Sequence, residues 1–252
     1  MQQQATPVRA ARLGKGVGPV PGAVGGVVLL LPGGEETSTR RPSPLTAAAV
    51  RPLARGLARS GRAEGLVTHV VHYRYRGWNG AQAEPARDAE WAADEVVRRY
   101  GDVPVCLAGV GIGGRAALRS GGHPAVDSVL ALAPWLPQDD VALPPEPVKQ
   151  LAGRRVLIVH GTDDRRADPE LSFRLAGRAK KANRDVCRFE VHSDGHRFAQ
   201  HRSEVTALAV DFMLGTLFGR PFSRPLQDAL AAPPPLGLRM PLASGFGQSL
   251  GR

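Results

Sequence analysis

Six residues in the middle of the chain, Gly109–Gly114 with the sequence GVGIGG, fit two glycine patterns that support different chemistry. As G-x-G-x-x-G, they could form the tight turn whose backbone cradles a dinucleotide pyrophosphate. As G-x-S-x-G, they could form the strand-to-helix turn that presents a nucleophilic serine, with Gly111 standing at the position of the serine. The two interpretations require different neighbours elsewhere in the chain.

The dinucleotide interpretation requires an acidic residue about 20 positions further on, at the end of the following strand, to bind the ribose hydroxyls. The following apolar run ends in Ala133-Pro134-Trp135, and Asp127 precedes that run instead of following it. Asp127 would then lie at the opposite edge of the sheet. Dinucleotide binding through GVGIGG therefore remains only the weaker alternative.

Two later segments supply the acid and the histidine that a nucleophile turn requires. HGTDD, residues 160–164, follows one apolar run, and HSDGH, residues 192–196, follows the next. Turn, acid and histidine occur in the chain order that the G-x-S-x-G interpretation predicts. Taken singly, these groups have simpler explanations, since an aspartate can cap the next helix and a histidine can lie on the surface. These explanations apply to Asp163, Asp164, His192, His196 and His201.

Four motifs in this order resemble the α/β-hydrolase superfamily over roughly residues 24–219. VVLLLPGG is similar to its oxyanion-loop strand, and VHYRYRGWN is similar to the strand and turn that follow. VLIVHGTDD is similar to the acid-bearing strand, and FEVHSDGH is similar to the histidine loop. The resemblance implies a pair made by Asp164 and His196, with Asp163 as the rival position for the acid.

The resemblance also implies oxyanion-hole donors and an open site. The donors would be the backbone N–H groups of Ile112 and Gly34. The stretch in which the superfamily inserts a lid, Gln138–Arg155, is too short here for a substantial cap domain. In this respect the chain resembles compact, lid-poor members, which are dienelactone-hydrolase-like or small carboxylesterase-like.

One departure from the family pattern decides the expected function. Gly111 has no side chain that could attack a carbonyl, and neither Ser120, Ser128 nor the strand residue Cys106 could replace it locally. Removing a serine nucleophile can cost about a millionfold in turnover. We therefore expect a noncatalytic or vestigial hydrolase that binds a small carbonyl-type ligand.

An alternative keeps catalysis without a covalent intermediate and leaves open whether the chain is an enzyme. The Asp164–His196 dyad could act as a general base on water or a carbon acid, in a hydrolase, lyase or cyclase of esters, lactones or thioesters. Trp78 and Trp135 lie at predicted strand ends and could line the ligand pocket. No cofactor and no metal is expected. His72 and His160 are expected to make structural hydrogen bonds.

The elements that must position these residues alternate along the chain. Short apolar runs alternate with segments of helical periodicity, which predicts an α/β fold with a mostly parallel sheet of about six strands and helices on both faces. Strands are expected at 27–31, 67–72, 103–108, 128–133, 156–160 and 186–191, and helices near 45–60, 88–100, 112–121, 169–182 and 203–218. The ends of parallel strands should then converge on one site.

The net charge of +10 is distributed over the body and both ends of the chain. Residues 1–26 are expected to be a disordered basic tail, residues 27–219 the hydrolase-like domain, and residues 220–252 a disordered Pro/Gly-rich tail. We expect neither a nucleic-acid nor a membrane partner, because solvated tails explain this charge more simply. Reduced, buried Cys106 and Cys187 indicate a cytoplasmic protein. An exposed sheet edge could support a homodimer.

Overall fold

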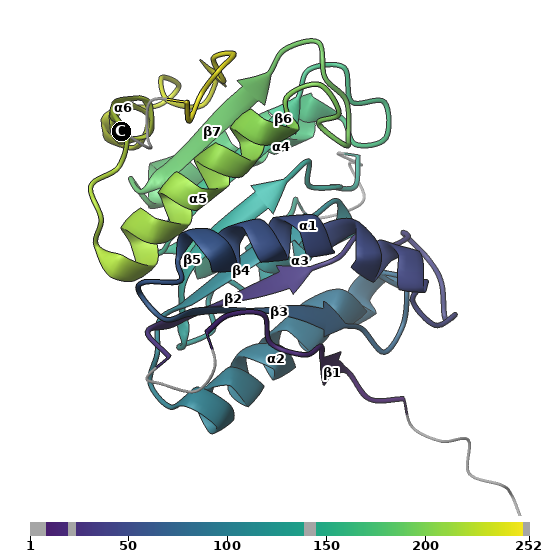
Figure 1. Cartoon of the computed structure of the whole chain (residues 1–252). Helices are drawn as coiled ribbons and strands as arrows, with labels where there is room; N and C mark the ends of the chain where they lie inside the picture. The colour runs from purple at the N-terminus through teal and green to yellow at the C-terminus, as the bar shows by residue number, and fades with distance from the viewer. Residues whose placement is uncertain (1–8, 20–23, 139–144, 249–252) are drawn as a thin grey trace, which may run out of the picture.

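The computed structural model describes residues 9–19, 24–138 and 145–248. They form an eight-stranded sheet with the strand order β1-β3-β2-β4-β5-β6-β7-β8 (Figure 1). The strands are β1 Arg12–Leu13, β2 Gly26–Leu31, β3 Leu66–His72, β4 Val105–Val110, β5 Val126–Leu132, β6 Arg155–Gly161, β7 Val186–Val191 and β8 Met240–Pro241. Strands β2 to β8 are parallel to their neighbours, and β1 pairs antiparallel with β3.

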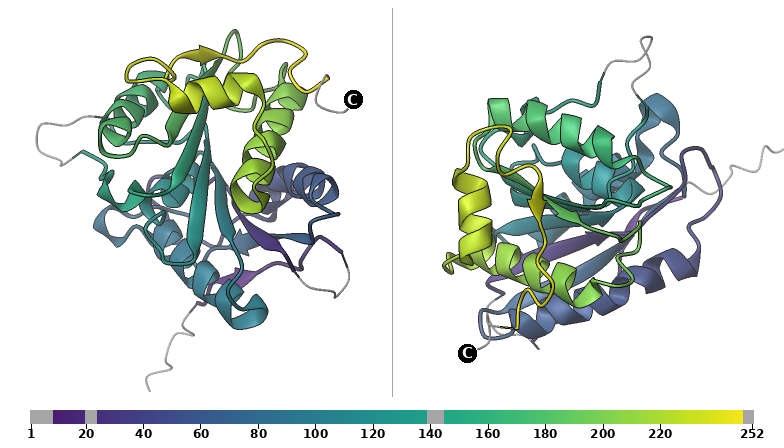
Figure 2. Two further views of the ribbon diagram at one scale, coloured as in Figure 1. Left: turned by 90° about the vertical axis from the view of Figure 1, so that its left-hand side faces the viewer. Right: turned by 90° about the horizontal axis from the view of Figure 1, so that it is seen from above.

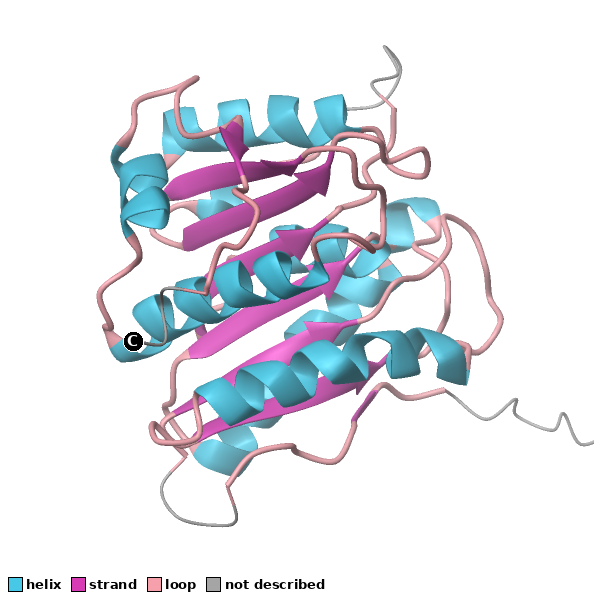
Figure 3. Cartoon of the chain, turned by 45° about the horizontal axis from the view of Figure 1, so that its top comes forward, coloured by secondary structure: helices cyan, strands magenta, loops and turns pink. Residues whose placement is uncertain are grey.

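The predicted α/β class is confirmed, because the six expected strands correspond to β2–β7 and helices cover both faces of the sheet (Figure 3). One face packs against α2 Glu84–Tyr100, α3 Ile112–Arg119 and α4 Pro169–Ala182, and the other against α1 Pro44–Ser60, α5 Arg202–Phe218 and α6 Arg224–Ala231. Short 3-10 helices are η1 Gly80–Gln82 and η2 Lys149–Leu151. Since both sheet faces are buried, the central strands are almost continuously apolar.

The helices begin where the local sequence provides an N-cap. Ser43 precedes α1, and its side chain accepts a hydrogen bond from the N–H of Leu45 at 3.3 Å. Asp168 precedes α4 and accepts from the N–H of Glu170 at 2.9 Å. In both helices the first residue is proline, which has no N–H to leave unsatisfied. These starts fix where the loops at the carboxyl ends of β2 and β6 finish.

The expectation of a disordered tail over residues 220–252 is wrong for its described part. This segment forms α6 and strand β8, which extends the sheet beyond β7 (Figure 2). Leu226 and Leu238 are fully buried, and the buried Lys180 ammonium donates to the carbonyl oxygens of Ala229 and Leu230 at 3.2 and 3.1 Å. A few apolar side chains suffice for order here because they cover an edge that would otherwise be exposed.

The basic tail predicted at residues 1–26 falls partly outside the described residues, which exclude 1–8 and 20–23. Within the described part, Arg12 and Leu13 form β1, and Val17 makes a further antiparallel bridge to Thr68. The expectation of disorder is therefore wrong for this part. The pairing adds a strand at one edge of the sheet, just as β8 does at the other.

The described residues between β5 and β6 form no large cap domain. The described residues of this connection include only the one-turn helix η2, while 139–144 lie outside the described part. Cys106 and Cys187 are free and buried, and burial raises the pKa of each thiol to about 12. Among the described residues, no helix is long and apolar enough to cross a membrane.

Candidate functional site

Gly111 occupies the sharp turn between β4 and α3. Its backbone angles are φ 57° and ψ −119°, a conformation that L-residues rarely adopt and glycine adopts with little strain. Its N–H donates to the carbonyl oxygen of Leu132 at 3.0 Å, and its carbonyl oxygen accepts from the N–H of Trp135 at 3.0 Å. A Cβ atom added here would lie 3.2 Å from Nε2 of His196. The turn therefore points the missing side chain directly at the histidine.

His196 and Asp164 form a hydrogen-bonded pair on the loops after the neighbouring strands β7 and β6. The Nδ1 atom of His196 lies 2.8 Å from Oδ2 of Asp164. The rival carboxylate, Asp163, is exposed and accepts instead from the hydroxyl of Thr162 at 3.1 Å. The structure thus pairs the histidine with Asp164, and the expected acid, histidine and glycine turn lie together.

The surroundings of Asp164 keep its carboxylate ionised. Burial alone would raise its pKa, but hydrogen bonds from His160, His196 and the backbone N–H groups of Arg166 and Ala167 outweigh burial and hold the pKa far below its usual range. An ionised acceptor at Oδ2 requires Nδ1 of His196 to carry a proton. In the neutral ring, Nε2 is then an acceptor that faces Gly111, which is the tautomer that a general base requires.

A second aspartate, Asp194, shapes the loop that carries the histidine. It is 3% exposed, and its Oδ2 accepts from the N–H groups of Gln200 and His201, both at 3.0 Å. The ring of His201 also lies 3.2 Å from this oxygen. Sequence reasoning overlooked Asp194, although an acid directly before the Gly195-His196 pair was a visible signal of a loop organised by a side chain.

The two predicted oxyanion donors belong to adjoining segments. A Cβ atom added to Gly34 would lie 3.2 Å from Cγ2 of Ile112 and only 2.5 Å from the carbonyl oxygen of Arg76, so this position requires glycine. Ile112 is the first residue of α3, where backbone N–H groups have no partner within the helix. Both residues therefore border the turn at Gly111, and their role as oxyanion donors stays a prediction.

Trp78 and Trp135, predicted to line a ligand pocket, both lie near the guanidinium group of Arg115. The guanidinium carbon of Arg115 lies 3.9 Å from the ring centroid of Trp78 and 5.5 Å from that of Trp135. Glu146 accepts from Nε and Nη2 of Arg115 at 2.8 and 2.7 Å. Sequence reasoning did not single out Arg115, because its partners lie far away in the chain. Ligand contacts of the tryptophans stay a prediction.

A chain of buried polar contacts runs from the Asp164 carboxylate to β7. Nε2 of His160 lies 3.3 Å from Oδ2 of Asp164, and its Nδ1 lies 2.8 Å from the hydroxyl oxygen of Ser172. This hydroxyl oxygen also accepts from Nε of Arg188 at 3.0 Å. The structural role predicted for His160 agrees with these contacts. The acid is therefore connected to a fully buried arginine on β7, three strands away from the β4 strand that leads into the glycine turn.

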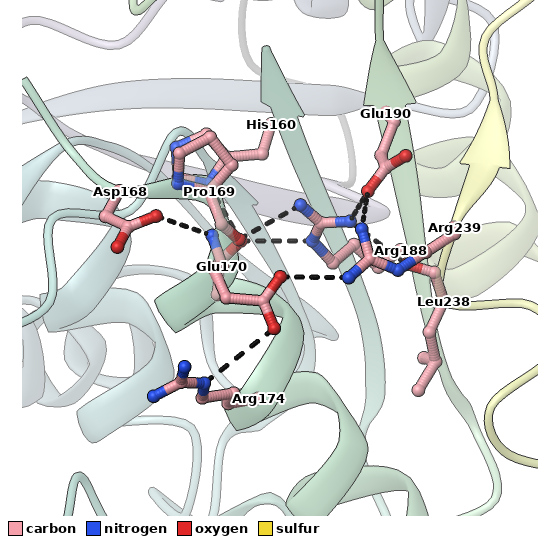
Figure 4. A network of polar contacts seen from close by, with 10 residues as sticks. His160, Asp168, Pro169, Glu170, Arg174, Arg188, Glu190, Leu238 and Arg239 are labelled. Atoms are coloured by element: carbon pink, nitrogen blue, oxygen red, sulfur yellow. Dashed lines mark hydrogen bonds and ion pairs between the residues drawn. The ribbon is translucent and has the colours of Figure 1, made fainter. Parts of the chain in front are cut away.

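Arg188 in turn connects this chain to the C-terminal segment (Figure 4). Its guanidinium donates to Oε1 of Glu190 at 2.7 Å, to the carbonyl oxygen of Leu238 at 3.0 Å and to that of Pro169 at 3.1 Å. Burial lowers the pKa of Arg188, and the neighbouring Glu190 opposes this shift. Arg239 adds a second cation at 3.2 Å from the Glu190 carboxylate. The segment beside β8 is thus part of the scaffold around the acid.

The structure places Asp127 far from the position where the dinucleotide interpretation requires an acid for the ribose hydroxyls. Asp127 lies near the start of β5, where its Oδ2 accepts from the N–H of Val105 at the start of β4 at 2.9 Å. It therefore sits at the amino ends of the parallel strands, opposite the edge that carries GVGIGG. The hydrogen bond from the N–H of Val105 gives the Asp127 carboxylate a structural role.

Solved structures similar to this chain are α/β serine hydrolases and esterases. The esterase Pf2001 of Pyrococcus furiosus is 15% identical with a TM-score of 0.61, over 77% of this chain and 82% of that chain. Est1E of Butyrivibrio proteoclasticus, solved with ferulic acid, is 14% identical with a TM-score of 0.58, over 82% of this chain and 95% of that one. XC6422 of Xanthomonas campestris, a serine hydrolase without lid, is 16% identical with a TM-score of 0.56, over 84% and 89%.

No protein-family model and no curated protein sequence matches the chain. At identities this low, the structural similarity establishes the fold, which is that of the α/β hydrolases. The chemistry at the turn must be argued from the side chains of this chain.

Proposed function

We propose that this chain uses the ligand site of an α/β-hydrolase fold without its serine chemistry, as a noncatalytic or vestigial hydrolase that binds a small carbonyl-type ligand. The observation that carries this proposal is Gly111, which has the backbone geometry of a nucleophile turn and directs no side chain toward His196. Covalent catalysis needs an atom at that point, and loss of a serine nucleophile costs about a millionfold in turnover.

The proposed ligand contacts follow from the polar groups around the turn. The N–H groups of Gly34 and Ile112 would donate to the carbonyl oxygen of the ligand, and Nε2 of His196 would accept a hydrogen bond from a hydroxyl group or a bridging water. His196 is suited to this contact because its side chain is 20% exposed while its partner Asp164 is fully buried. The ligand would therefore meet one acceptor and two donors at a turn without a nucleophile.

A second candidate function is base catalysis without a covalent intermediate. It is favoured by the ionised Asp164, whose hydrogen bond leaves Nε2 of His196 as an acceptor toward the space beside Gly111. A water or a carbon acid placed there would give its proton to Nε2, and the imidazolium that forms would be stabilised by the carboxylate. Ester, lactone and thioester substrates would each place a carbonyl oxygen near the proposed donors.

Restoring the missing atom tests the main proposal. In Gly111→Ser, the new hydroxyl would face His196 after the ring retreats by a few tenths of an ångström, because a Cβ atom would lie 3.2 Å from Nε2. A serine-directed fluorophosphonate probe is expected to label this variant and to leave the parent chain unlabelled. Misplacement of the hydroxyl by about 1 Å would reduce the labelling rate about 10²-fold.

Two matched variants make the labelling test specific. Gly177→Ser adds a serine on α4, where a Cβ atom meets nothing within 4 Å, and is expected to stay unlabelled. Gly111→Ser combined with His196→Ala should lose most labelling, because the base is absent. Strong labelling of the parent chain would contradict the proposal, since it would reveal a nucleophile elsewhere.

Activity of the unaltered turn separates the two candidate functions. Activated esters, lactones and thioesters are offered to the parent chain and to His196→Ala. Base catalysis predicts a turnover that falls by about 10²-fold or more in the variant, within the usual contribution of a general base. Equal residual rates in the two proteins would count against base catalysis and would leave noncatalytic binding.

A further inference from the structure

A small pocket separate from the glycine turn lies between β1, the end of β3 and the start of α1. Its volume is about 180 Å³. Its lining includes the basic side chains Arg12, Arg51 and His72 and the hydroxyl residues Ser43 and Thr46. Tyr73 also lines it, and its hydroxyl donates to the carbonyl oxygen of Pro32 at 3.1 Å. No acidic residue is part of its lining. We call it the arginine pocket.

The strand pairing brings the basic groups together. Arg12 of β1 is the direct cross-strand partner of His72 at the end of β3, so the two side chains share one face of the sheet. Arg51 joins them from the second turn of α1. Within the described part of the chain, neither arginine side chain makes a hydrogen bond or an ion pair. Like charges placed directly opposite each other destabilise a sheet pair.

The state of His72 reflects this arrangement. Burial lowers the pKa of His72, and the positive charges of Arg12 and Arg51 lower it further. Contrary to the structural role expected from its position at a strand end, His72 makes no side-chain hydrogen bond to another described residue. His72 lines the pocket together with Arg12 and Arg51, so an anion bound there would lie beside all three groups.

We propose that the arginine pocket binds a small phosphate-type oxyanion, either inorganic phosphate or the phosphate group of a small molecule. Two guanidinium groups, one from β1 and one from α1, provide the charge and the planar hydrogen-bonding groups that phosphate recognition uses. The volume lies below the range of about 300–1,000 Å³ that is typical of drug-sized ligands, which favours a single anionic group. The pocket contains none of the residues Gly111, Asp164 and His196, so the proposal is independent of the proposed function.

Two further features of α1 suit a bound anion. The first turn of the helix contains no acidic residue, and the positive end of the helix dipole lies beside Ser43 and Thr46. The hydroxyl oxygen of Ser43 accepts from the N–H of Leu45, which leaves its own hydrogen free to donate to a ligand. These features add to the attraction of the two arginines and would orient the oxyanion.

Titration calorimetry of the full chain with inorganic phosphate and with methyl phosphate at low ionic strength tests the proposal. Arg12→Gln and Arg51→Gln are each expected to weaken binding roughly tenfold or more, as expected for loss of a charge-assisted hydrogen bond. Arg55→Gln removes the same charge from an exposed position of α1 outside the pocket and should leave the affinity unchanged. Tighter binding of methyl phosphate would identify an organic phosphate as the occupant, and tighter binding of inorganic phosphate would identify the free ion.

A second measurement keeps the proposal testable if a substitution in β1 disturbs folding. The ring resonances of His72 in an NMR titration should respond to phosphate, and its pKa should rise, because a bound anion stabilises the imidazolium. Arg51 lies on an exposed helix surface, so Arg51→Gln tests the proposal even if Arg12→Gln fails to fold. No binding of either phosphate, equal affinity in the parent chain, Arg12→Gln and Arg51→Gln, or an unresponsive His72 would overturn it.

Discussion

Arginines near the two ends of the same sheet differ in how their charge is satisfied. Arg188 on β7 is fully buried, and the fold supplies its acceptors, among them Glu190 and the hydroxyl of Ser172. Arg12 and Arg51, near the β1 edge, are exposed and line a pocket without an acid. A buried guanidinium must find its partners within the chain, whereas exposed arginines can leave theirs to the solvent or a ligand.

The difference also separates scaffold from ligand site. The contacts of Arg188 continue through Ser172 and His160 to Asp164, so this edge fixes the acid beside His196. These hydrogen bonds do not involve the side chain at residue 111. The geometry of the acid and the histidine therefore does not depend on which residue occupies position 111, because folding itself requires the same contacts.

The largest effect is expected from removing the buried guanidinium. Arg188→Met should lower the free energy of unfolding by about 3–5 kcal/mol, because it takes the buried cation away from Glu190 and leaves the carbonyl oxygen of Leu238 without its donor. Denaturant unfolding followed by circular dichroism measures the change. Arg55→Met on exposed α1 is the control and should stay within about 0.5 kcal/mol of the parent. A similar loss of stability in both variants would contradict the idea that the buried arginine contributes more to stability than an exposed one.

An intermediate effect on stability is expected when the pH is lowered. The pKa of Asp164 is lowered in the folded state, so the unfolded chain binds a proton at higher pH than the folded chain does. The carboxylate therefore contributes stability above its unfolded pKa, about 3.9, and this contribution is lost as the pH falls below that value. Asp164→Asn should be less stable than the parent at neutral pH and should lose less stability between about pH 5 and pH 2.

Unfolding midpoints at a series of pH values measure this difference. Asp163→Asn changes the exposed neighbour and should follow the pH profile of the parent. Equal slopes for the parent and Asp164→Asn would show that the contacts from His160 and His196 do not favour the charged carboxylate.

The smallest effect on stability is expected at the β1 edge. Arg51→Met should change the free energy of unfolding by less than about 0.5 kcal/mol, and at low salt it should stabilise the chain by relieving repulsion with Arg12. The gain should fade at about 0.15 M salt, where the Debye length is about 8 Å. Paired unfolding curves at two salt concentrations measure it. A loss as large as that of Arg188→Met would assign Arg51 a structural role.

Much of the fold and part of the candidate site could be predicted from local patterns. The apolar runs locate β2–β7, and HGTDD and HSDGH follow two neighbouring ones. The resemblance to α/β hydrolases assigned Asp164 and His196 within these segments, with Asp163 as the rival, and the structure pairs Asp164 with His196. Such features depend on chain order and on periodicity, which the sequence displays directly. The absence of a nucleophile at Gly111 likewise follows from a single residue type in the turn.

Only the tertiary structure decided which distant side chains satisfy one another. Arg188 reaches Leu238 and Ser172, and Arg115 reaches both tryptophans and Glu146, across separations that no local pattern encodes. The order of the C-terminal segment was also missed, because its low apolar content predicts disorder for an isolated chain. Its Leu226 and Leu238 become buried only because folding presents the edge of β7 to them, and that surface exists only once the sheet has formed.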